Sequence, residues 1–189
     1  MLTLLLLSSC GTSVERLGIE EVKDLSGAWN DIDSQMVSKE MITDMLERPW
    51  QRDFTQKNQR KPTLIVGTIN NLSHEHINVN TFVNDIEREV INSGRVDFVA
   101  SSGERNEIRS ERKDQDTNAR EDTRKAMGQE IGADFMLKGS INTIIDVDGT
   151  TQVRYYQIDL NLISLADNRK VWVGSKKIKK LIKNSKLRY

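Results

Sequence analysis

Hydrophobic residues recur with a helical period in two stretches of this chain. Residues 32–46 carry an apolar stripe with four-residue spacing: Val37, Met41 and Met45. Residues 82–92 carry a second stripe: Phe82, Val83, Ile86 and Val90. Each spacing predicts an amphipathic helix that buries one face. We expect Asp31 or Asp33 to cap the first helix, which should end before Pro49, because the residue before a proline avoids the helical conformation.

Strand patterns occupy much of the remaining apolar sequence. β-Branched or alternating runs are found at residues 63–69, 96–100, 133–147 and 153–165 and around 171–173. Runs of this kind, bounded by turn residues, predict strands. Asp148-Gly149 is a hairpin signal, and Ala166-Asp167-Asn168 marks a second turn. The last three strands are therefore predicted to form an antiparallel meander.

The order of the predicted elements defines the fold class. A helix, a strand, a helix and a strand precede a charged helical stretch at 104–131, and the meander follows. This order predicts an α/β fold: a single small domain with a mixed sheet that ends in a three-stranded meander and is flanked by helices. The length of 189 residues and the hydrophobic content of 37 % suit one domain with its own core.

The first ten residues have the pattern of a bacterial lipoprotein signal. An apolar run is followed by Ser8-Ser9-Cys10, and Cys10 is the only cysteine. We expect Cys10 to carry the lipid; the alternative is a stray apolar N-terminus with an ordinary buried cysteine. The chain is thus divided into four parts: a signal remnant at 1–9, a lipidated tether at 10–25, an α/β domain at 26–183 and a basic tail at 184–189.

Motifs for catalysis or cofactor binding are missing from the sequence. His74-Glu75-His76 lies in a predicted loop without a third metal ligand nearby, so hydrogen bonding is its expected role. Asp146-Val147-Asp148-Gly149 lacks the downstream ligands of a calcium loop and is expected to be the hairpin turn. Glycine-rich phosphate loops and nucleophile motifs do not occur. We therefore predict a protein that is not an enzyme and that uses no metal, cofactor or small-molecule substrate.

Charge is distributed unevenly, although the formal net charge is zero. Residues 104–125 contain fourteen charged side chains, seven of each sign. On a helix, the acidic side chains would gather on one side and the basic ones on another. Such a helix presents either a solvated face or a surface that pairs with complementary charges on a partner. The candidate partner-binding residues are on this helix and at a strand end: Arg105, Arg109, Arg112 and Trp172.

The C-terminal part of the chain is strongly basic. Residues 169–189 carry nine Lys or Arg and no acidic residue. Such a run is typical of a solvated strand end and tail; the alternative is attraction to anionic lipid headgroups or to an anionic cell-wall polymer. Too few aromatic residues accompany the lysines to stack on nucleic-acid bases, so no nucleic-acid partner is expected.

Nine segments between Leu25 and Ile182 together carry a family resemblance. They are Leu25-Ser26-Gly27-Ala28-Trp29-Asn30-Asp31, Arg48-Pro49-Trp50, Lys61-Pro62-Thr63-Leu64-Ile65-Val66-Gly67, Ser73-His74-Glu75-His76-Ile77, Asn84-Asp85-Ile86-Glu87-Arg88, Ile91-Asn92-Ser93-Gly94, Gly132-Ala133-Asp134-Phe135-Met136-Leu137-Lys138-Gly139-Ser140-Ile141, Tyr155-Tyr156-Gln157 and Lys170-Val171-Trp172-Val173-Gly174. With these segments the chain resembles the LpoB family, outer-membrane lipoproteins that activate penicillin-binding proteins.

The resemblance implies a fold similar to the N-terminal domain of TolB and a lipid anchor at the periplasmic face of the outer membrane. It further implies binding to a bifunctional penicillin-binding protein, a peptidoglycan synthase that the lipoprotein stimulates. The alternative is a secretion-pore subunit resembling the curli-export lipoprotein, which shares the lipidated cysteine and a strand followed by a Glu-Arg-rich helix. A pore requires long amphipathic hairpins, whereas the predicted hairpin at 133–165 is polar at its tip.

Overall fold

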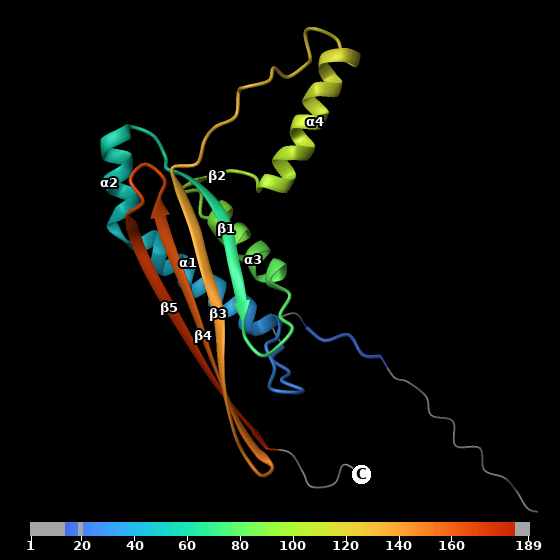
Figure 1. Ribbon diagram of the computed structural model, residues 1–189, viewed down its shortest axis with the longest axis vertical. Coiled ribbons are helices and arrows are strands. Elements are labelled where there is room, and N and C mark those ends of the chain that lie inside the picture. The colour runs from blue at the N-terminus through green and yellow to red at the C-terminus, as the bar shows by residue number, and fades with distance from the viewer. Residues whose placement is uncertain (1–13, 19–20, 184–189) are drawn as a thin grey trace, which may run out of the picture.

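The structure is a computed structural model that describes residues 14–18 and 21–183. The helices are α1 (Asp31–Glu47), α2 (Pro49–Asn58), α3 (Val79–Asn92) and α4 (Ser102–Asn118). The strands are β1 (Thr63–Leu72), β2 (Asp97–Phe98), β3 (Phe135–Asp148), β4 (Thr151–Ser164) and β5 (Lys170–Lys183). They form the predicted single α/β domain, in which helices flank a mixed sheet (Figure 1). The signal remnant 1–9, Cys10 and the tail 184–189 lie outside the described residues.

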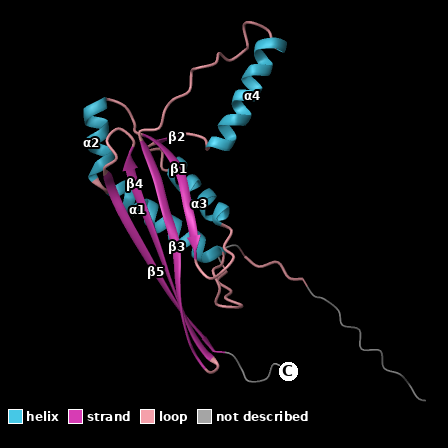
Figure 2. Ribbon diagram, in the orientation of Figure 1, coloured by secondary structure: helices cyan, strands magenta, loops and turns pink. Residues whose placement is uncertain are grey.

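The five strands are arranged in the order β2-β1-β3-β4-β5, so β5 forms one edge of the sheet (Figure 2). β1 runs parallel to β2 and β3, whereas β3, β4 and β5 form the predicted antiparallel meander. Asp148 pairs with Thr151, and Gly149 between them adopts a φ of +56°. Glycine tolerates this left-handed conformation, which tight hairpin turns require. The predicted turn at Asp148-Gly149 is therefore confirmed.

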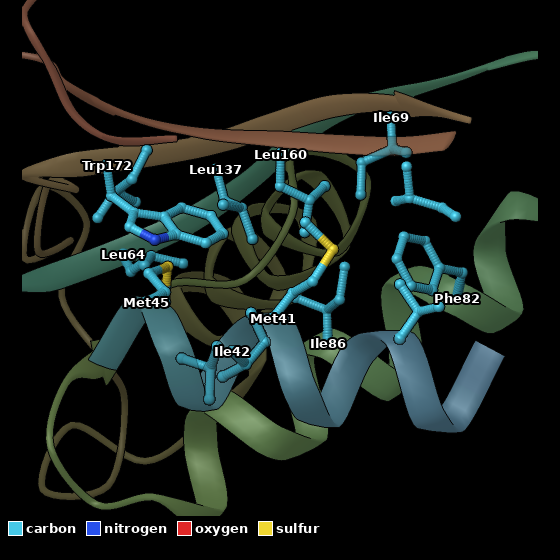
Figure 3. Close-up of a cluster of buried hydrophobic side chains, with 14 of the residues drawn as sticks. Met41, Ile42, Met45, Leu64, Ile69, Phe82, Ile86, Leu137, Leu160 and Trp172 are labelled. Atoms are coloured by element: carbon cyan, nitrogen blue, oxygen red, sulfur yellow. The ribbon is translucent and has the colours of Figure 1, made fainter. Parts of the chain in front are cut away.

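Helices α1 and α3 pack on one face of the sheet and enclose the hydrophobic core (Figure 3). The alternating residues of β4 are fully buried, as their pattern predicted: Tyr156, Ile158, Leu160 and Leu162. The apolar stripes of the two helices contact them from the other side: Val37, Met41 and Met45 from α1, and Phe82, Ile86 and Val90 from α3. Burial of each such side chain stabilises the fold by roughly 1.5–3 kcal/mol. This helix-on-sheet core is therefore what holds the domain together.

Local hydrogen bonds fix the start of α1 and a proline fixes the start of α2. The side chain of Asn30 accepts a hydrogen bond from the Asp33 amide, and the Asp33 carboxylate accepts one from the Asn30 amide. The cap is thus Asn30 rather than Asp31 or Asp33, and Asp33 completes a capping box. Pro49 ends α1 as predicted, but it also begins α2, a helix that the apolar pattern did not predict. Proline suits a first helical turn, where its missing N–H needs no partner.

Three elements differ in extent from the sequence prediction. The charged stretch at 104–131 is helical only as far as Asn118, after which Ala119 is extended. The strand expected at 96–100 is reduced to Asp97–Phe98, which pairs with the first two residues of β1. The last strand, in contrast, continues to Lys183, so most of the lysine run belongs to the sheet.

Candidate functional site

Residues 99–134 form an arm that leaves the sheet and returns to it (Figure 1). The arm consists of α4 and an irregular return segment at 119–134. No side chain of α4 is buried, and Ile108, its large apolar residue, is 42 % exposed. A helix without a buried face gains little stability from packing. Ile108 therefore does not anchor α4 to the core.

The three candidate arginines hold the arm together internally. Arg109 donates through Nε and Nη2 to the two carboxylate oxygens of Glu130 at 2.9 and 2.8 Å, and Arg112 donates to the same carboxylate at 3.4 Å. The hydrogen bond from Arg109 lowers the pKa of Glu130, and the same bond raises the pKa of Arg109. Arg105 donates to the carbonyl oxygen of Ala100 at 2.6 Å. Glu130 of the return segment thus pairs with two of the three arginines on the basic side of α4.

The acidic side of α4 faces solvent instead. Its exposed carboxylates include those of Glu107, Glu111 and Asp114. A partner that approaches α4 therefore meets acidic groups first and the arginines only in part. Whether Arg105, Arg109 and Arg112 contact a partner stays a prediction.

Trp172 lies in the core, with 6 % of its surface exposed. Its indole N–H donates to Oδ2 of Asp44 at 2.8 Å, and its ring lies so close to Gly174 that a Cβ there would be 2.2 Å from it. Partial burial alone would raise the pKa of Asp44, but hydrogen bonds from Trp172 and Arg48 lower it. Trp172, a candidate partner-binding residue, is therefore not exposed at the strand end, because it packs under α1. The neighbouring exposed side chain is Val173.

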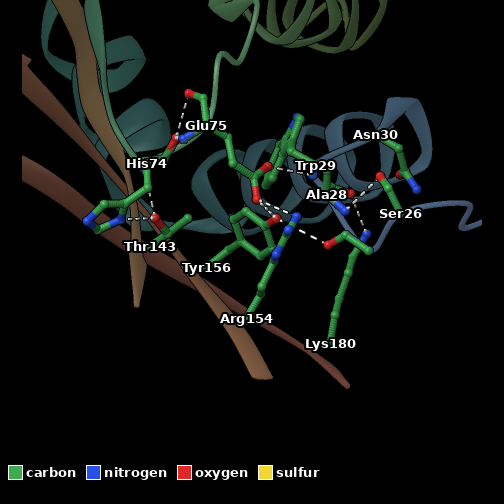
Figure 4. Close-up of polar contacts among 12 residues, drawn as sticks. Ser26, Ala28, Trp29, Asn30, His74, Glu75, Thr143, Arg154, Tyr156 and Lys180 are labelled. Atoms are coloured by element: carbon green, nitrogen blue, oxygen red, sulfur yellow. Dashed lines mark hydrogen bonds and ion pairs between the residues drawn. The ribbon is translucent and has the colours of Figure 1, made fainter. Parts of the chain in front are cut away.

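A polar cluster fastens the segment that precedes α1 to the sheet (Figure 4). Oε1 of Glu75 accepts hydrogen bonds from Nη1 of Arg154 at 2.9 Å and from the Tyr156 hydroxyl at 2.6 Å. Oε2 of Glu75 accepts a hydrogen bond from the backbone amide of Trp29 at 3.0 Å. The Trp29 ring packs edge-on against Tyr156, with 5.7 Å between the ring centroids. We call the side chains that hold this segment the clasp: Trp29, Glu75, Arg154, Tyr156 and Lys180.

Lys180 supplies the second half of the clasp. Its Nζ donates to Asp33 at 2.6 Å, to Asp24 at 2.9 Å and to the carbonyl oxygen of Ala28 at 3.1 Å. Partial burial alone would lower the pKa of Lys180, but the hydrogen bonds to Asp33 and Asp24 raise it. Burial, and after it the hydrogen bond to Glu75, raises the pKa of Tyr156. The clasp therefore favours a charged lysine and a neutral tyrosine.

The histidine-containing loop has the hydrogen-bonding role that the sequence predicted. Nδ1 of His74 lies 3.0 Å from the Thr143 hydroxyl, and the His74 amide donates to the same oxygen at 3.1 Å. Glu75 belongs to the clasp. Among the described residues, no group of three or more His, Cys, Asp or Glu side chains could hold a metal ion.

A groove of about 840 Å³ lies between α2 and the turn that joins β4 to β5. Trp50, Phe54 and Asp134 are among its lining residues. Arg60 stacks over the Phe54 ring and donates to both carboxylate oxygens of Asp134 at 2.7 Å. Partial burial alone would raise the pKa of Asp134, but the hydrogen bonds from Arg60 and Thr63 lower it. The carboxylate of Asp134 in this groove is thus already paired with Arg60.

The sheet face opposite the helices is open to solvent. Along β4 the Tyr155 hydroxyl donates to Gln157 at 3.3 Å, and Gln157 donates to Asp159 at 2.8 Å. This hydrogen-bonded row keeps a wide sheet face polar although no helix covers it. Within residues 14–18 and 21–183, no helix has the length and apolarity needed to cross a bilayer.

The domain thus presents an arm and an open sheet face, and its N-terminal segment is held by the clasp. These are features of a small binding domain. The family model described as peptidoglycan-synthase activator LpoB matches residues 33–178, and the chain belongs to this family. Its members are outer-membrane lipoproteins that activate penicillin-binding proteins in peptidoglycan synthesis. The match gives no support to the alternative of a secretion-pore subunit.

Solved structures with a similar arrangement include the LpoB C-terminal domain from Escherichia coli, with 15 % sequence identity and a TM-score of 0.48, covering 78 % of this chain and 99 % of that one. The NMR structure of E. coli LpoB has 14 % identity and a TM-score of 0.44, covering 94 % of this chain and 84 % of that one. Lipoprotein GNA1162 from Neisseria meningitidis has 14 % identity and a TM-score of 0.41, with coverages of 67 % and 88 %. A comparison with curated protein sequences finds no match.

Proposed function

We propose that this chain is a lipid-anchored periplasmic activator that binds a bifunctional penicillin-binding protein and stimulates its peptidoglycan synthesis. The observation that carries this proposal is the family match over residues 33–178, which extends from the first turn of α1 into β5. The protein acts on an enzyme rather than as one. Cys10 carries the lipid, which places the domain at the periplasmic face of the outer membrane.

Activation follows from differential binding. An activator that binds the active conformation of the synthase more tightly than the inactive one shifts the enzyme toward activity, and the difference in affinity limits the effect. A coupling free energy of about 1–3 kcal/mol corresponds to roughly 5- to 150-fold stimulation. Binding alone is therefore sufficient, and the chain needs no catalytic group for it.

The arm at residues 99–134 is the element that docks on the synthase. Its helix has no buried residue, so the arm is not needed for the core, yet its capping box at Ser101 and its ion pairs to Glu130 keep it ordered. The two oppositely charged sides of this projecting helix attract a partner domain with complementary charges. They also fix the position of that domain along the helix. Arg105, Arg109 and Arg112 contribute the basic side.

The arm can be removed without disturbing the sheet. The amide of Val99 donates to the carbonyl oxygen of Leu64, and the amide of Asp134 donates to that of Thr63. Both ends of the arm therefore flank β1 and lie about two strand spacings, roughly 10 Å, apart. A linker of about four to six Gly and Ser residues spans that distance. It replaces residues 101–132 in a variant without the arm.

The test measures glycan polymerisation and peptide crosslinking by each bifunctional penicillin-binding protein of the same organism. The unlipidated Cys10→Ala chain is expected to stimulate one of them, and the variant without the arm is expected to keep its circular dichroism and melting transition but to lose stimulation. Failure of the intact chain with every such synthase would overturn the activator proposal. Full stimulation by the variant without the arm would overturn the arm as docking element.

Replacement of Cys10 should also release the protein from membranes washed with high salt, and retention there would contradict the anchor.

A further inference from the structure

The lysines of the edge strand β5 lie on two different faces of the sheet. Lys176 and Lys180 lie on the helix side, where Lys176 pairs with Glu40 and Lys180 with Asp24 and Asp33. The alternating lysines are exposed on the opposite face: Lys177, Lys179 and Lys183. Within the described part of the chain, none of these three makes an ion pair or a side-chain hydrogen bond. One face of β5 is thus neutralised internally, and the other carries free positive charge.

Exposed aliphatic side chains accompany the free lysines at the hairpin end of the sheet. Leu181 lies between Lys179 and Lys183 on the same face and is 62 % exposed. On β3, at the same end and on the same face, Ile144 is 65 % exposed. In the register of the sheet, Ile144 is opposite Tyr155, which is opposite Lys179. One such side chain is ordinary on a protein surface, but two beside unpaired lysines form a mixed basic and apolar surface.

We propose that this basic sheet end, defined by the outward side chains of residues 177–183 and by the hairpin end of β3, rests on the surface of an anionic lipid membrane. The lysines are attracted to anionic headgroups, and each one near such a surface strengthens binding about fivefold. The aliphatic side chains enter the boundary between headgroups and acyl chains, as those of interfacial segments do. The two kinds of side chain therefore act together on one surface.

Two acidic residues of β3 lie on the same face as the lysines, and they set the orientation of contact. Asp148 is opposite Thr151, which is opposite Lys183, and Asp146 is opposite Val153 and then Leu181. Each carboxylate is thus two strand spacings, roughly 10 Å, from β5, which is about one Debye length at 0.1 M salt. The β5 edge therefore contacts the membrane first.

The placement of the N-terminal segment agrees with this orientation. Lys180 binds Asp24, so the chain that leads back to Cys10 leaves the domain beside β5. The hairpin end lies at one end of the molecule and the arm at the other (Figure 1). A domain resting on its basic sheet end would point the arm away from the membrane. This orientation rests on the proposed lipid anchor, whereas the lipid contact of β5 does not.

Two other occupants fit this surface less well. A hydrated anionic polymer attracts the lysines, but it offers no apolar contact to Leu181 and Ile144. A second copy of the chain could pair its own β5 edge with this one, but that would bring two rows of lysines together, and lysines on an edge strand oppose such pairing. The lipid surface uses both the charged and the aliphatic side chains.

The experiment measures cosedimentation of the unlipidated Cys10→Ala chain with vesicles of phosphatidylethanolamine and phosphatidylglycerol, with pure phosphatidylcholine vesicles for comparison. Binding to the anionic vesicles is expected, and it should weaken as salt is raised. The triple variant K177Q/K179Q/K183Q should bind about 100-fold more weakly. Leu181→Ser should bind several-fold more weakly, and stimulation of the synthase in solution should stay unchanged in both variants.

The matched control removes the same charge from exposed lysines on three helices: K39Q/K57Q/K113Q. It should bind the vesicles like the parent chain, and circular dichroism should show all variants folded. Equal binding by the two triple variants would overturn the proposal, as would equal binding of the parent to anionic and neutral vesicles. Binding to isolated peptidoglycan but not to vesicles would assign the surface to cell-wall polymer instead. If the parent chain self-associates and only the K177Q/K179Q/K183Q variant does not, the surface would be assigned to contact with a second copy of the chain.

Discussion

The sheet and the arm of this domain are built on opposite principles. In the sheet, alternating apolar residues of β4 are fully buried between their neighbours and the helices. In the arm, α4 buries no side chain, and its contacts to the return segment are ion pairs and hydrogen bonds of Arg109 and Arg112 with Glu130. The first region provides most of the stability of the domain, and the second presents exposed charge.

The difference shows where a binding element can be placed on a marginally stable protein. A docking arm that contributes little to the core can change its sequence or be displaced by a partner without unfolding the domain. The clasp lies between these extremes, because it joins the N-terminal segment to the sheet through half-buried polar groups.

The largest effect is expected in the core. Leu162 is fully buried, and it is opposite both Leu137 and Trp172 in the sheet. Leu162→Ala should lower the free energy of unfolding by about 2–5 kcal/mol in urea titrations, because it removes buried surface and leaves a cavity. Ile108→Ala in the arm should lower it by less than about 0.5 kcal/mol. Similar losses from the two changes would mean that α4 packs on the core in solution.

The clasp should give an intermediate effect. Glu75→Gln keeps the shape of the side chain but removes the charge opposite Arg154, whose Nε is buried without a hydrogen-bond partner within the described part of the chain. We expect a loss of about 2–3 kcal/mol in the free energy of unfolding, since an uncompensated charge is left in a partly buried site. The control is Glu89→Gln, whose carboxylate lies 3.9 Å from the more exposed Arg88 and should cost less than about 0.5 kcal/mol. Equal costs would contradict the clasp.

The same cluster makes stability depend on alkaline pH. The pKa values of Tyr156 and Lys180 are both raised in the folded state. Their contribution is therefore complete below about pH 10, where both groups are protonated in either state, and it is lost as the pH rises through the folded-state values. The free energy of unfolding should fall more steeply above pH 10 in the parent than in the Y156F/K180Q variant. Identical slopes would show that these two groups do not titrate differently in the two states.

The parts of the fold that could be predicted are those whose pattern is local. The stripe of α1, the alternation of β4 and the Asp148-Gly149 turn each place their residues correctly, since the spacing of apolar side chains directly reflects which face is buried. Helix α2 was missed because only Trp50 of its ten residues is buried, so it has no stripe. Pro49 at its first position was the available signal.

The site contacts could not be predicted in the same way, because their partners are distant in sequence. Glu75 contacts Arg154 and Tyr156, which are 79 and 81 residues away. The spacing of the arginines on α4 correctly placed them on one side, but their partner Glu130 lies in a segment that was predicted to continue the helix. In β5, lysines at 176–183 looked alike in sequence, and only the acids brought close by α1 and the N-terminal segment distinguish the inner pair from the outer three.

The smallest change in global stability is expected from Glu130→Gln, and it tests whether the arm is a separate unit. This substitution weakens the contacts of Arg109 and Arg112 that join α4 to the return segment. Since no core residue is touched, urea unfolding should be unchanged within error, whereas amide hydrogen exchange should become faster in residues 102–118 and stay the same in β3, β4 and β5. Glu121→Gln, which removes a highly exposed carboxylate 3.9 Å from Arg124, should alter neither measurement. Faster exchange throughout the sheet would show that the arm unfolds together with the core, and the contrast between the two regions would then be lost.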